Sequence, residues 1–287
     1  MYHSKKQLQR WIILFLFGIF ILSLAFFVYT LNWQDKNLEV SFLNVGQGDS
    51  IYIKSPSGVD ILIDGGRDAS VLYELGKVMP FNDKKINMVL ATHPDEDHIA
   101  GLGEVIKRYN VNWLFKPCVL SKTDAGILLE EYSKRVNSIC VKRGLIIDLG
   151  AGVFLKVLSP AYQTKNMDTN VASIVVQLVY GNTKIMLTGD APVSIERELA
   201  LLDKELLQSD ILKAGHHGSK TSTSPEFLGF VDPKIVIISA GKNNRYGHPH
   251  KSVVKRLNDY GAQILETSKE GTITFYSDGN SIWREIK

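Results

Sequence analysis

Low-complexity segments, linkers rich in proline or serine, and internal repeats are all missing from this 287-residue sequence. Apolar residues make up 45% of it and charged residues 22%, with 23 glycines and 9 prolines. An apolar content this high can build a large core, so a disordered, collagen-like or low-complexity protein is excluded. The length alone fits either one large α/β domain or two small ones.

A strong net charge is also missing, because 33 basic and 30 acidic residues leave a formal charge of only +3. A protein that is basic throughout, as many nucleic-acid binders are, is therefore not indicated. The charge is nevertheless uneven along the chain, since residues 213–256 hold eight basic and two acidic residues. Ordinary solvated lysines are one explanation, but such a local excess favours a polyanionic substrate near this segment.

Cysteine is nearly absent, with only Cys118 and Cys140 in the sequence. Cys118 ends a strand-like stretch, and Cys140 follows a stretch over 124–139 for which we expect a helix. The far end of such a helix lies about 24 Å from the end of the preceding strand. A disulfide needs Cα atoms within about 7 Å, so we expect two buried free thiols.

Charged residues, histidine and side-chain amides are missing from residues 11–31. A helix of this length spans about 31 Å, the thickness of the hydrocarbon core of a lipid bilayer. Lys5, Lys6 and Arg10 precede the span, and basic flanks stay in the cytoplasm. We therefore expect a cytoplasmic basic tail over 1–10, a transmembrane anchor over 11–31, and an extracytoplasmic domain over 36–287.

A cleaved signal peptide is the alternative to the anchor. Ser23-Leu24-Ala25 fits a small-x-small cleavage site, which leaves open secretion after cleavage near Ala25. The apolar run continues to Leu31, however, and this length favours the anchor. Both interpretations place the remaining chain outside the cytoplasm.

Beyond residue 36, strand-like and helix-like stretches alternate in both halves of the chain. Apolar runs rich in β-branched residues predict strands at 41–45, 50–55, 59–64, 86–92, 171–180, 183–188 and 234–240. Helical spacing of apolar residues predicts helices over 98–109, 193–202 and 252–260. We expect one domain in which two sheets pack face to face with helices outside.

Histidine is missing between residues 99 and 215, although the chain has seven histidines. Six of them follow directly on predicted strands: His93, His98, His216, His217, His248 and His250. The run HPDEDH over 93–98 adds three carboxylates, and carboxylates that converge with imidazoles at strand ends suit a divalent cation. A helix cap or a solvated loop explains any single position, but the shared placement favours a functional site.

The sequence THPDEDHIAGL resembles the metal-binding motif of the metallo-β-lactamase superfamily. The further motifs SFLNVGQGDSIYI, ILIDGG, MLTGD, LKAGHHGSKTSTS and GHPH, in this order, resemble the C-terminal hydrolase domain of the ComEC competence proteins. Together the motifs cover most of residues 38–255. The resemblance implies an α/β protein with an αββα sandwich and two metal ions between the sheets.

The resemblance also implies roles for individual residues. His93 and Asp95 hold one ion, and Asp97, His98 and a histidine of the HHGS motif hold the other. Asp190 bridges the two ions, and Asp97 and Asp190 orient the attacking hydroxide. We expect His216 rather than His217 to be the ligand, because His216 follows the strand directly. Supporting positions behind the ligands are expected at Asp49, Asp64 and Asn170.

Two departures from the superfamily pattern bear on the metal. Superfamily members usually carry histidine where Asp95 stands, and a further histidine ligand between positions 99 and 189, where this chain has none. The resulting site is rich in oxygen, which favours Mn²⁺ over Zn²⁺.

Two adjacent divalent ions suit phosphodiester hydrolysis, because they activate a water and neutralise the attacking and leaving oxygens. The resemblance and the basic segment favour a membrane-anchored nuclease that acts on single-stranded DNA. His248 is expected to assist the leaving oxygen or to be an additional metal ligand, with further phosphate contacts from His217, Ser219, Lys220, Thr223 and Arg245. The alternatives are hydrolysis of cell-wall phosphodiesters or of small esters and lactones, and a DNA-binding module without catalysis.

Overall fold

The structure, a computed structural model, describes residues 2–32, 37–119, 123–161 and 168–285. The chain divides into two units, residues 1–36 and residues 37–287, and we call the second the globular unit. The expected domain start at residue 36 lies outside the described residues. Every described strand belongs to the globular unit.

The described residues of the first unit form one helix, α1 (Tyr2–Asn32). Its segment Gln9–Phe26 has a mean hydropathy of 2.0, and none of that segment is buried. Large apolar side chains such as Phe15 and Leu22 are 70% and 72% exposed. By length and composition this helix can cross a membrane. A signal sequence has the same properties, so α1 fits both interpretations of the N-terminal segment.

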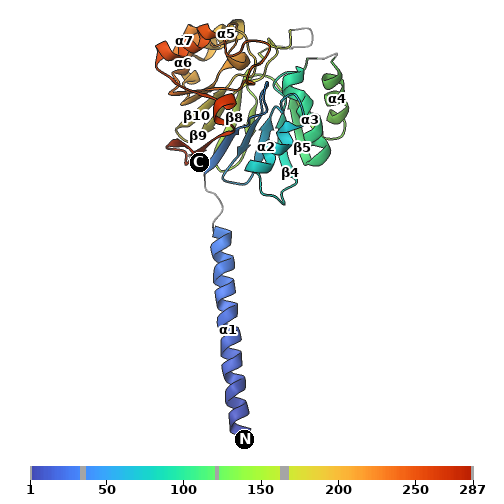
Figure 1. Cartoon of the computed structure of the whole chain (residues 1–287), viewed down its shortest axis with the longest axis vertical. Coiled ribbons are helices and arrows are strands. Elements are labelled where there is room, and N and C mark those ends of the chain that lie inside the picture. The colour runs from blue at the N-terminus through green and yellow to red at the C-terminus, as the bar shows by residue number, and fades with distance from the viewer. Residues whose placement is uncertain (1, 33–36, 120–122, 162–167, 286–287) are drawn as a thin grey trace. The chain divides into compact units, whose positions relative to one another are not determined.

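Two mixed sheets form the globular unit (Figure 1). The first has the order β15-β14-β1-β2-β3-β4-β5-β6. Its strands are β1 (Leu38–Phe42), β2 (Ile51–Lys54), β3 (Asp60–Ile63), β4 (Lys85–Leu90), β5 (Asn110–Lys116), β6 (Asn137–Cys140), β14 (Ile273–Ser277) and β15 (Ile282–Arg284). The second has the order β13-β12-β11-β10-β9-β8-β7. Its strands are β7 (Ile146–Asp148), β8 (Val153–Ser159), β9 (Val175–Tyr180), β10 (Thr183–Leu187), β11 (Ile211–Lys213), β12 (Ile235–Ile238) and β13 (Gln263–Glu266).

Apolar side chains join the sheets to one another and to the helices outside them. One cluster lies between the sheets and contains Phe42 and Ile63 from the first and Leu155 and Ile185 from the second. A second cluster packs α2 (Ser70–Val78), α3 (Glu96–Arg108) and α4 (Asp124–Ser133) on the first sheet. A third packs α5 (Val193–Asp203), α6 (Pro225–Val231) and α7 (Lys251–Tyr260) on the second. The short helices η1 (Lys204–Leu207), η2 (Gly215–Gly218) and α8 (Thr267–Glu270) lie in connections. The predicted αββα sandwich is confirmed.

Parallel pairing brings the loops of the candidate site together. Strands β3 to β6 run parallel to one another, and so do β10 to β13. The carboxyl ends of parallel strands meet at one edge of a sheet, where ligands bind in many α/β proteins. The loops after β4, β10, β11 and β12 carry residues 93–98, 190, 216–217 and 248. The histidine-rich loops of the sequence therefore lie at the carboxyl ends of strands from both sheets.

The region around the two cysteines differs from expectation. Helix α4 ends at Ser133, and residues 137–140 form β6, which pairs in parallel with β5. The helix is short because the stretch 136–139 (Val-Asn-Ser-Ile) consists of residues with low helix propensity. The Cα atoms of Cys118 and Cys140 consequently lie 5.2 Å apart, and the two residues form a disulfide. The expectation of two buried free thiols is wrong, and Cys140 is exposed.

Removal of this disulfide tests its contribution to stability. The two cysteines are 22 residues apart, and closing a loop of this length stabilises the folded state by about 3 kcal/mol. We expect the double variant Cys118→Ser/Cys140→Ser to have a lower melting temperature than the oxidised wild type in calorimetry. Reduced wild type is the control and should melt with the variant. Equal melting of the oxidised and reduced wild type would contradict the prediction.

Candidate metal centre

Asp190 lies at the centre of the site. It follows Gly189, which has a φ of +51°, and a Cβ at that glycine would lie 3.1 Å from Cβ of Thr92. The side chain of Asp190 is buried. The four nearest ring nitrogens lie 3.4–3.9 Å from its carboxylate oxygens and belong to His93, His98, His216 and His217. The carboxylate thus joins loops from both sheets.

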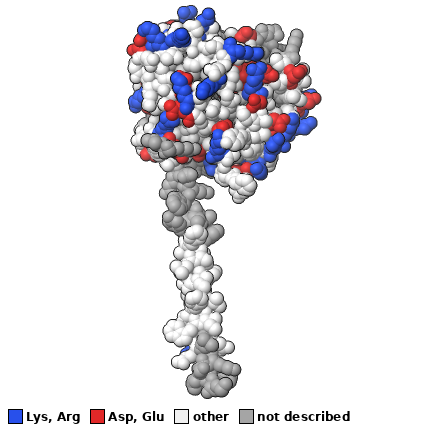
Figure 2. Space-filling view, in the orientation of Figure 1, with Lys and Arg blue, Asp and Glu red and all other residues white. Residues whose placement is uncertain are grey.

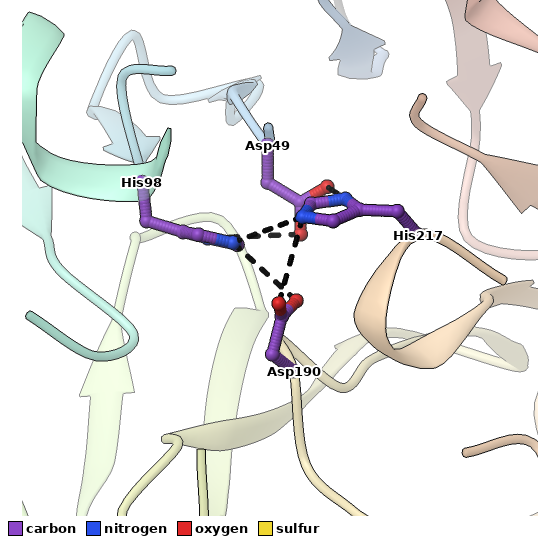
Figure 3. Close-up of side chains that lie close together, drawn as sticks. All are labelled: Asp49, His98, Asp190 and His217. Atoms are coloured by element: carbon purple, nitrogen blue, oxygen red, sulfur yellow. Dashed lines mark hydrogen bonds and ion pairs between the residues drawn. The ribbon is translucent and has the colours of Figure 1, made fainter. Parts of the chain in front are cut away.

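His98, His217 and Asp97 form an inner group with Asp190 (Figure 3 shows all but Asp97). His98 Nε2 lies 3.3 Å from His217 Nε2 and 3.4 Å from Asp190 Oδ1. His217 Nε2 lies 3.4 Å from Asp97 Oδ2 and 3.5 Å from Asp190 Oδ2. Both imidazoles are buried and point at the Asp190 carboxylate in Figure 3. We expected His216 in this place, but the structure brings His217 to Asp97 and His98.

An outer group approaches Asp190 Oδ2 with wider spacing. His93 Nε2 lies 3.6 Å from Asp95 Oδ2 and 3.9 Å from Asp190 Oδ2. His216 Nε2 lies 3.6 Å from Asp190 Oδ2, and its side chain is 28% exposed. His93 is fully buried, whereas the Asp95 side chain is 37% exposed. The outer group therefore borders the surface.

These donor atoms fit divalent cations. Ligands about 2.0–2.1 Å from one tetrahedral ion are about 3.4 Å from one another. The inner separations of 3.3–3.5 Å match this spacing. His93 Nε2 and Asp190 Oδ1 are buried without a hydrogen-bond partner, a situation that is rare for polar atoms. The cluster of carboxylates and imidazoles is thus suited to bind divalent metal ions.

Hydrogen bonds on the far ring nitrogens orient both inner histidines. Nδ1 of His98 donates to Asp64 Oδ2 at 2.7 Å, and Thr92 donates to Asp64 from its amide at 2.8 Å and from its hydroxyl at 2.7 Å. Nδ1 of His217 donates to the carbonyl oxygen of Ser239 at 2.9 Å. Each bond leaves Nε2 free to face the cluster, as in many metal-binding histidines.

Lys213 introduces a permanent positive charge beneath the cluster. The side chain is fully buried at the end of β11, and its ammonium group forms an ion pair with Asp49 Oδ2. The ammonium nitrogen also donates to the carbonyl of Gly189 at 3.2 Å and lies 3.7 Å from Asp190 Oδ1. Asp49 Oδ1 lies 3.4 Å from His217 Nδ1. Asp49 comes from the loop between β1 and β2, so the ion pair links the two sheets.

The pKa shifts of the histidines indicate that negative charge exceeds positive charge in the cluster. Burial disfavours the charged imidazole, but Asp190 and Asp64 raise the pKa of His98 well above its usual value. Burial acts against His217 too, yet Asp190 and Asp49 raise its pKa to about 9. His93 lacks such support, and burial together with the positive charge of His98 lowers its pKa to about 3. The two raised values indicate an excess of carboxylate charge that cations neutralise.

The backbone of the HHGS loop is unusual. His216 and His217 have φ values of 48° and 55°, and Gly218 continues the left-handed conformation with φ 78°. Non-glycine residues adopt this conformation at a cost of about 1 kcal/mol or more each. The loop is held by bonds from His216 N to Gly189 O at 3.2 Å and from His250 N to Gly218 O at 2.9 Å. The strain is maintained at the point where both imidazoles reach Asp190.

The residues expected to contact substrate differ in exposure. Arg245 and Lys220 are exposed, and His248 is half-buried, with its ring centre 5.5 Å from that of His216. Burial and the positive charges of His216 and His217 lower the pKa of His248 to about 4. Ser219 and Thr223 are buried, and the Thr223 hydroxyl accepts from the amide of Gly215 at 3.2 Å. Asn170 lies in a turn after Asp168, and its Oδ1 is buried without a partner.

The basic residues of segment 213–256 do not all reach the site. Lys213 is buried within it, and Lys234 pairs with Asp210 at the opposite ends of the strands. Lys220, Lys242 and Arg245 are exposed on the loops beside the cluster. On the face drawn in Figure 2, basic and acidic side chains of the globular unit are interspersed. The excess of charge in the sequence therefore overstates the positive charge available to a ligand at the metal cluster.

Two residues of the site have roles that the sequence motifs do not identify. Lys213 ends a strand and was counted with the surface lysines, although a lysine flanked by Leu212 and Ala214 in a buried run indicates burial. Thr92 precedes the HPDEDH run and supports Asp64 from the neighbouring strand. Both act through partners distant in the sequence, which spacing alone does not reveal.

Comparisons with known proteins agree with this geometry. Residues 43–115 match the Metallo-beta-lactamase superfamily. ComE operon protein 3 of Bacillus subtilis is 34% identical over 256 residues, which are 83% of this chain and 33% of that protein. Recombination protein 2 of Haemophilus influenzae is 29% identical over 274 residues, 91% of this chain and 32% of that protein. The chain thus spans about one third of the length of these relatives.

Solved structures share the fold. The metallo-β-lactamase fold protein YhfI of Bacillus subtilis superposes with a TM-score of 0.56 at 11% identity and covers 87% of this chain and 100% of YhfI. Sequence identity this low supports the fold and nothing further. The resemblance inferred from the motifs is confirmed: the chain carries a metallo-β-lactamase domain and is similar over most of its length to one part of the ComEC-like competence proteins.

Proposed function

We propose that the protein is a metal-dependent phosphodiesterase that cleaves DNA outside the cytoplasm while anchored in the membrane by α1. The observation that carries the proposal is the convergence of four histidines and two further carboxylates on the two sides of Asp190. Such a donor set on a superfamily fold supports a metal-dependent hydrolase. The fold alone does not select the substrate.

The two groups of side chains would hold two ions with Asp190 between them. Asp97, His98 and His217 would hold the inner ion, because their donor atoms have the closest spacing. His93 and Asp95 would hold the outer ion. His216 reaches the same Asp190 oxygen as His93, so we assign it to the outer group, where the sequence lacks the usual further histidine.

When bound, a pair of divalent ions supplies a nucleophile at neutral pH and neutralises the charge of the attacking and leaving oxygens. The protein's own part is to hold the ligands without rearrangement. Asp64 and Ser239 fix the rings of His98 and His217, and the ion pair with Lys213 keeps the Asp49 carboxylate behind His217. His248 is neutral at pH 7 according to its lowered pKa, so it is suited to donate a hydrogen bond from its ring N–H to the leaving oxygen.

The donor set also bears on the choice of metal. The outer group contains carboxylates at Asp95 and Asp190, where an all-histidine site would offer nitrogen. Oxygen donors favour harder ions such as Mn²⁺ over Zn²⁺. We therefore propose Mn²⁺ as the working ion of both groups, with Zn²⁺ as the alternative.

DNA is supported by the relatives and by the residues beside the cluster. The matched proteins include the Competence protein ComA of Neisseria gonorrhoeae and Recombination protein 2, names that point to DNA. Lys220, Lys242 and Arg245 are exposed on loops next to the histidines and suit phosphate contacts. Hydrolysis of cell-wall phosphodiesters or small esters is the second candidate, since the interspersed charges of Figure 2 show no extended basic surface on that face.

Two observations support an extracytoplasmic position of the globular unit. Lys5, Lys6 and Arg10 precede the apolar helix and favour a cytoplasmic N-terminus. The disulfide between Cys118 and Cys140 in the globular unit is typical of an oxidising compartment. The apolar run over 11–31 is long for a signal peptide, and this length favours an anchor that is retained.

Variants of Lys213 and Asp49 test whether the ion pair supports the site. In EDTA, Lys213→Met leaves a buried carboxylate without its partner, so the free energy of unfolding should fall by about 3–5 kcal/mol. The double variant Asp49→Asn/Lys213→Met should recover most of this loss, because it removes both charges. Urea unfolding followed by tryptophan fluorescence measures each value. A Lys213→Met protein as stable as the wild type would contradict the supporting role.

Cleavage of end-labelled single-stranded DNA with Mn²⁺ or Zn²⁺ tests the proposed activity. His98→Ala should reduce cleavage to the level without enzyme, and Asp64→Asn should reduce metal affinity or rate by about 10- to 100-fold. The matched control is His250→Asn, because His250 caps α7 through Ser252 N and asparagine preserves that acceptor. Metal binding by the wild type without DNA cleavage would reject the nuclease, and cell-wall phosphodiesters and small esters would be assayed next.

Labelling of a single cysteine tests the orientation. In Cys118→Ser the exposed Cys140 is left as a free thiol. A maleimide that cannot cross membranes should label it in intact cells expressing the full chain, and the labelled protein should sediment with membranes at full length. Labelling only after lysis would place the globular unit in the cytoplasm. Labelled protein in the medium, shortened near Ala25, would favour the signal peptide.

A further inference from the structure

A rigid loop presents one aromatic side chain beside the metal cluster. Tyr246 lies in the connection between β12 and α7, and its side chain is 48% exposed. The side-chain oxygen of Asn244 accepts hydrogen bonds from the amides of Tyr246 at 3.1 Å and His248 at 3.0 Å. Its amide group donates to the carbonyl of Gly241 at 2.8 Å. The position of Tyr246 is therefore fixed before any ligand binds.

A series of rings leads from the metal ligands to this tyrosine. The Tyr246 ring lies nearly parallel to the ring of His248, with an interplanar angle of 24° and centres 5.9 Å apart. The His248 ring meets that of His216 edge to face at 5.5 Å. His216 Nε2 is 3.6 Å from Asp190 Oδ2. One ring, that of His248, thus lies between Tyr246 and the proposed ligand His216.

Two guanidinium groups accompany the tyrosine. Arg245 places its Cζ 4.9 Å from the centre of the Tyr246 ring and donates to the phenol oxygen at 2.8 Å. Arg67, in the loop after β3, also lies within interaction range of Tyr246 and pairs with Glu96 at 2.8 Å. The loops of both sheets therefore bring positive charge to one exposed ring.

We propose that Tyr246, with Arg245 and Arg67, is a platform that stacks one nucleobase of a single-stranded substrate next to the phosphodiester at the metal cluster. The proposal rests on the proposed nuclease function and narrows its substrate. A partly exposed aromatic ring with adjacent guanidinium groups is a combination that binds single-stranded nucleic acid, with stacking on the ring and positive charge near the backbone. A polyol phosphate or a small ester offers no base to stack.

A purely structural role for Tyr246 is the competing explanation, since its ring also packs on His248. The two roles differ in their dependence on the base. A platform contributes only when the substrate carries a base, whereas a brace for His248 affects every substrate equally. The readout is therefore the ratio between a 12-mer of thymidylate and a 12-mer of the same backbone without bases.

The experiment uses the full chain in detergent micelles with Mn²⁺. Wild type should cleave the thymidylate 12-mer with a kcat/KM about 10- to 100-fold above that for the abasic 12-mer. Tyr246→Ala should bring this ratio close to one, and Tyr246→Phe, which keeps the ring, should preserve it. Tyr260→Ala is the matched control, because Tyr260 is also exposed but lies with Asp232 and Lys234 at the opposite ends of the strands. An unchanged ratio in Tyr246→Ala would overturn the platform.

Fluorescence anisotropy of the same labelled 12-mers in EDTA separates this proposal from the nuclease itself. Loss of the preference for thymidylate in Tyr246→Ala supports the platform even if neither 12-mer is cleaved, in which case the nuclease proposal alone fails. Equal binding of both 12-mers by the wild type overturns the platform whatever the cleavage result.

Discussion

Burial of negative charge is the constraint on which the structure of this protein depends. Asp49, Asp64 and Asp190 are all buried at the carboxyl ends of the strands, where an unpaired carboxylate is costly. Each therefore has a positively charged or hydrogen-bonding partner from another loop: Lys213 for Asp49, His98 for Asp64, and the histidines for Asp190. Because Asp49 belongs to the first sheet and Lys213 to the second, neutralisation of charge also fixes the two sheets against each other.

The same constraint explains the strained backbone at this edge. Left-handed φ values occur at Asp64, Gly189, His216, His217 and Thr223, all within the loops of the cluster. Extended or helical conformations would point these side chains elsewhere, and the buried carboxylates would lose their partners. The cost of about 1 kcal/mol or more per strained residue is smaller than that of an uncompensated buried charge. Site geometry and backbone strain are therefore two consequences of one electrostatic requirement.

Much of the fold could be predicted from the sequence, because local patterns of apolar and polar residues indicate the strands and helices. Apolar runs located most of the central strands, and five of the six histidines that follow strand ends lie at the candidate site. Pairings between distant residues were not accessible. The choice between His216 and His217 depends on a left-handed turn, and the burial of Lys213 depends on Asp49, which lies far from it in sequence. The disulfide was missed because residues 137–140, which are poor helix formers, pair with β5 as strand β6, a contact between elements that local spacing does not reveal.

The inner and outer residues also have different roles. The inner residues bear on the reaction, and the outer residues bear on the choice of substrate. The inner imidazoles are buried, so the inner group supports metal-dependent hydrolysis but carries no information about a polymer. Only the exposed groups at the rim can distinguish substrates. Few of these groups are cationic, because Lys213 is buried in an ion pair with Asp49. A few phosphate contacts give weak, salt-sensitive binding that any polyanion shares. Selectivity for one polymer class must therefore come from a group other than charge, and on the described rim Tyr246, half-exposed and separated from His216 by the ring of His248, is placed to supply it.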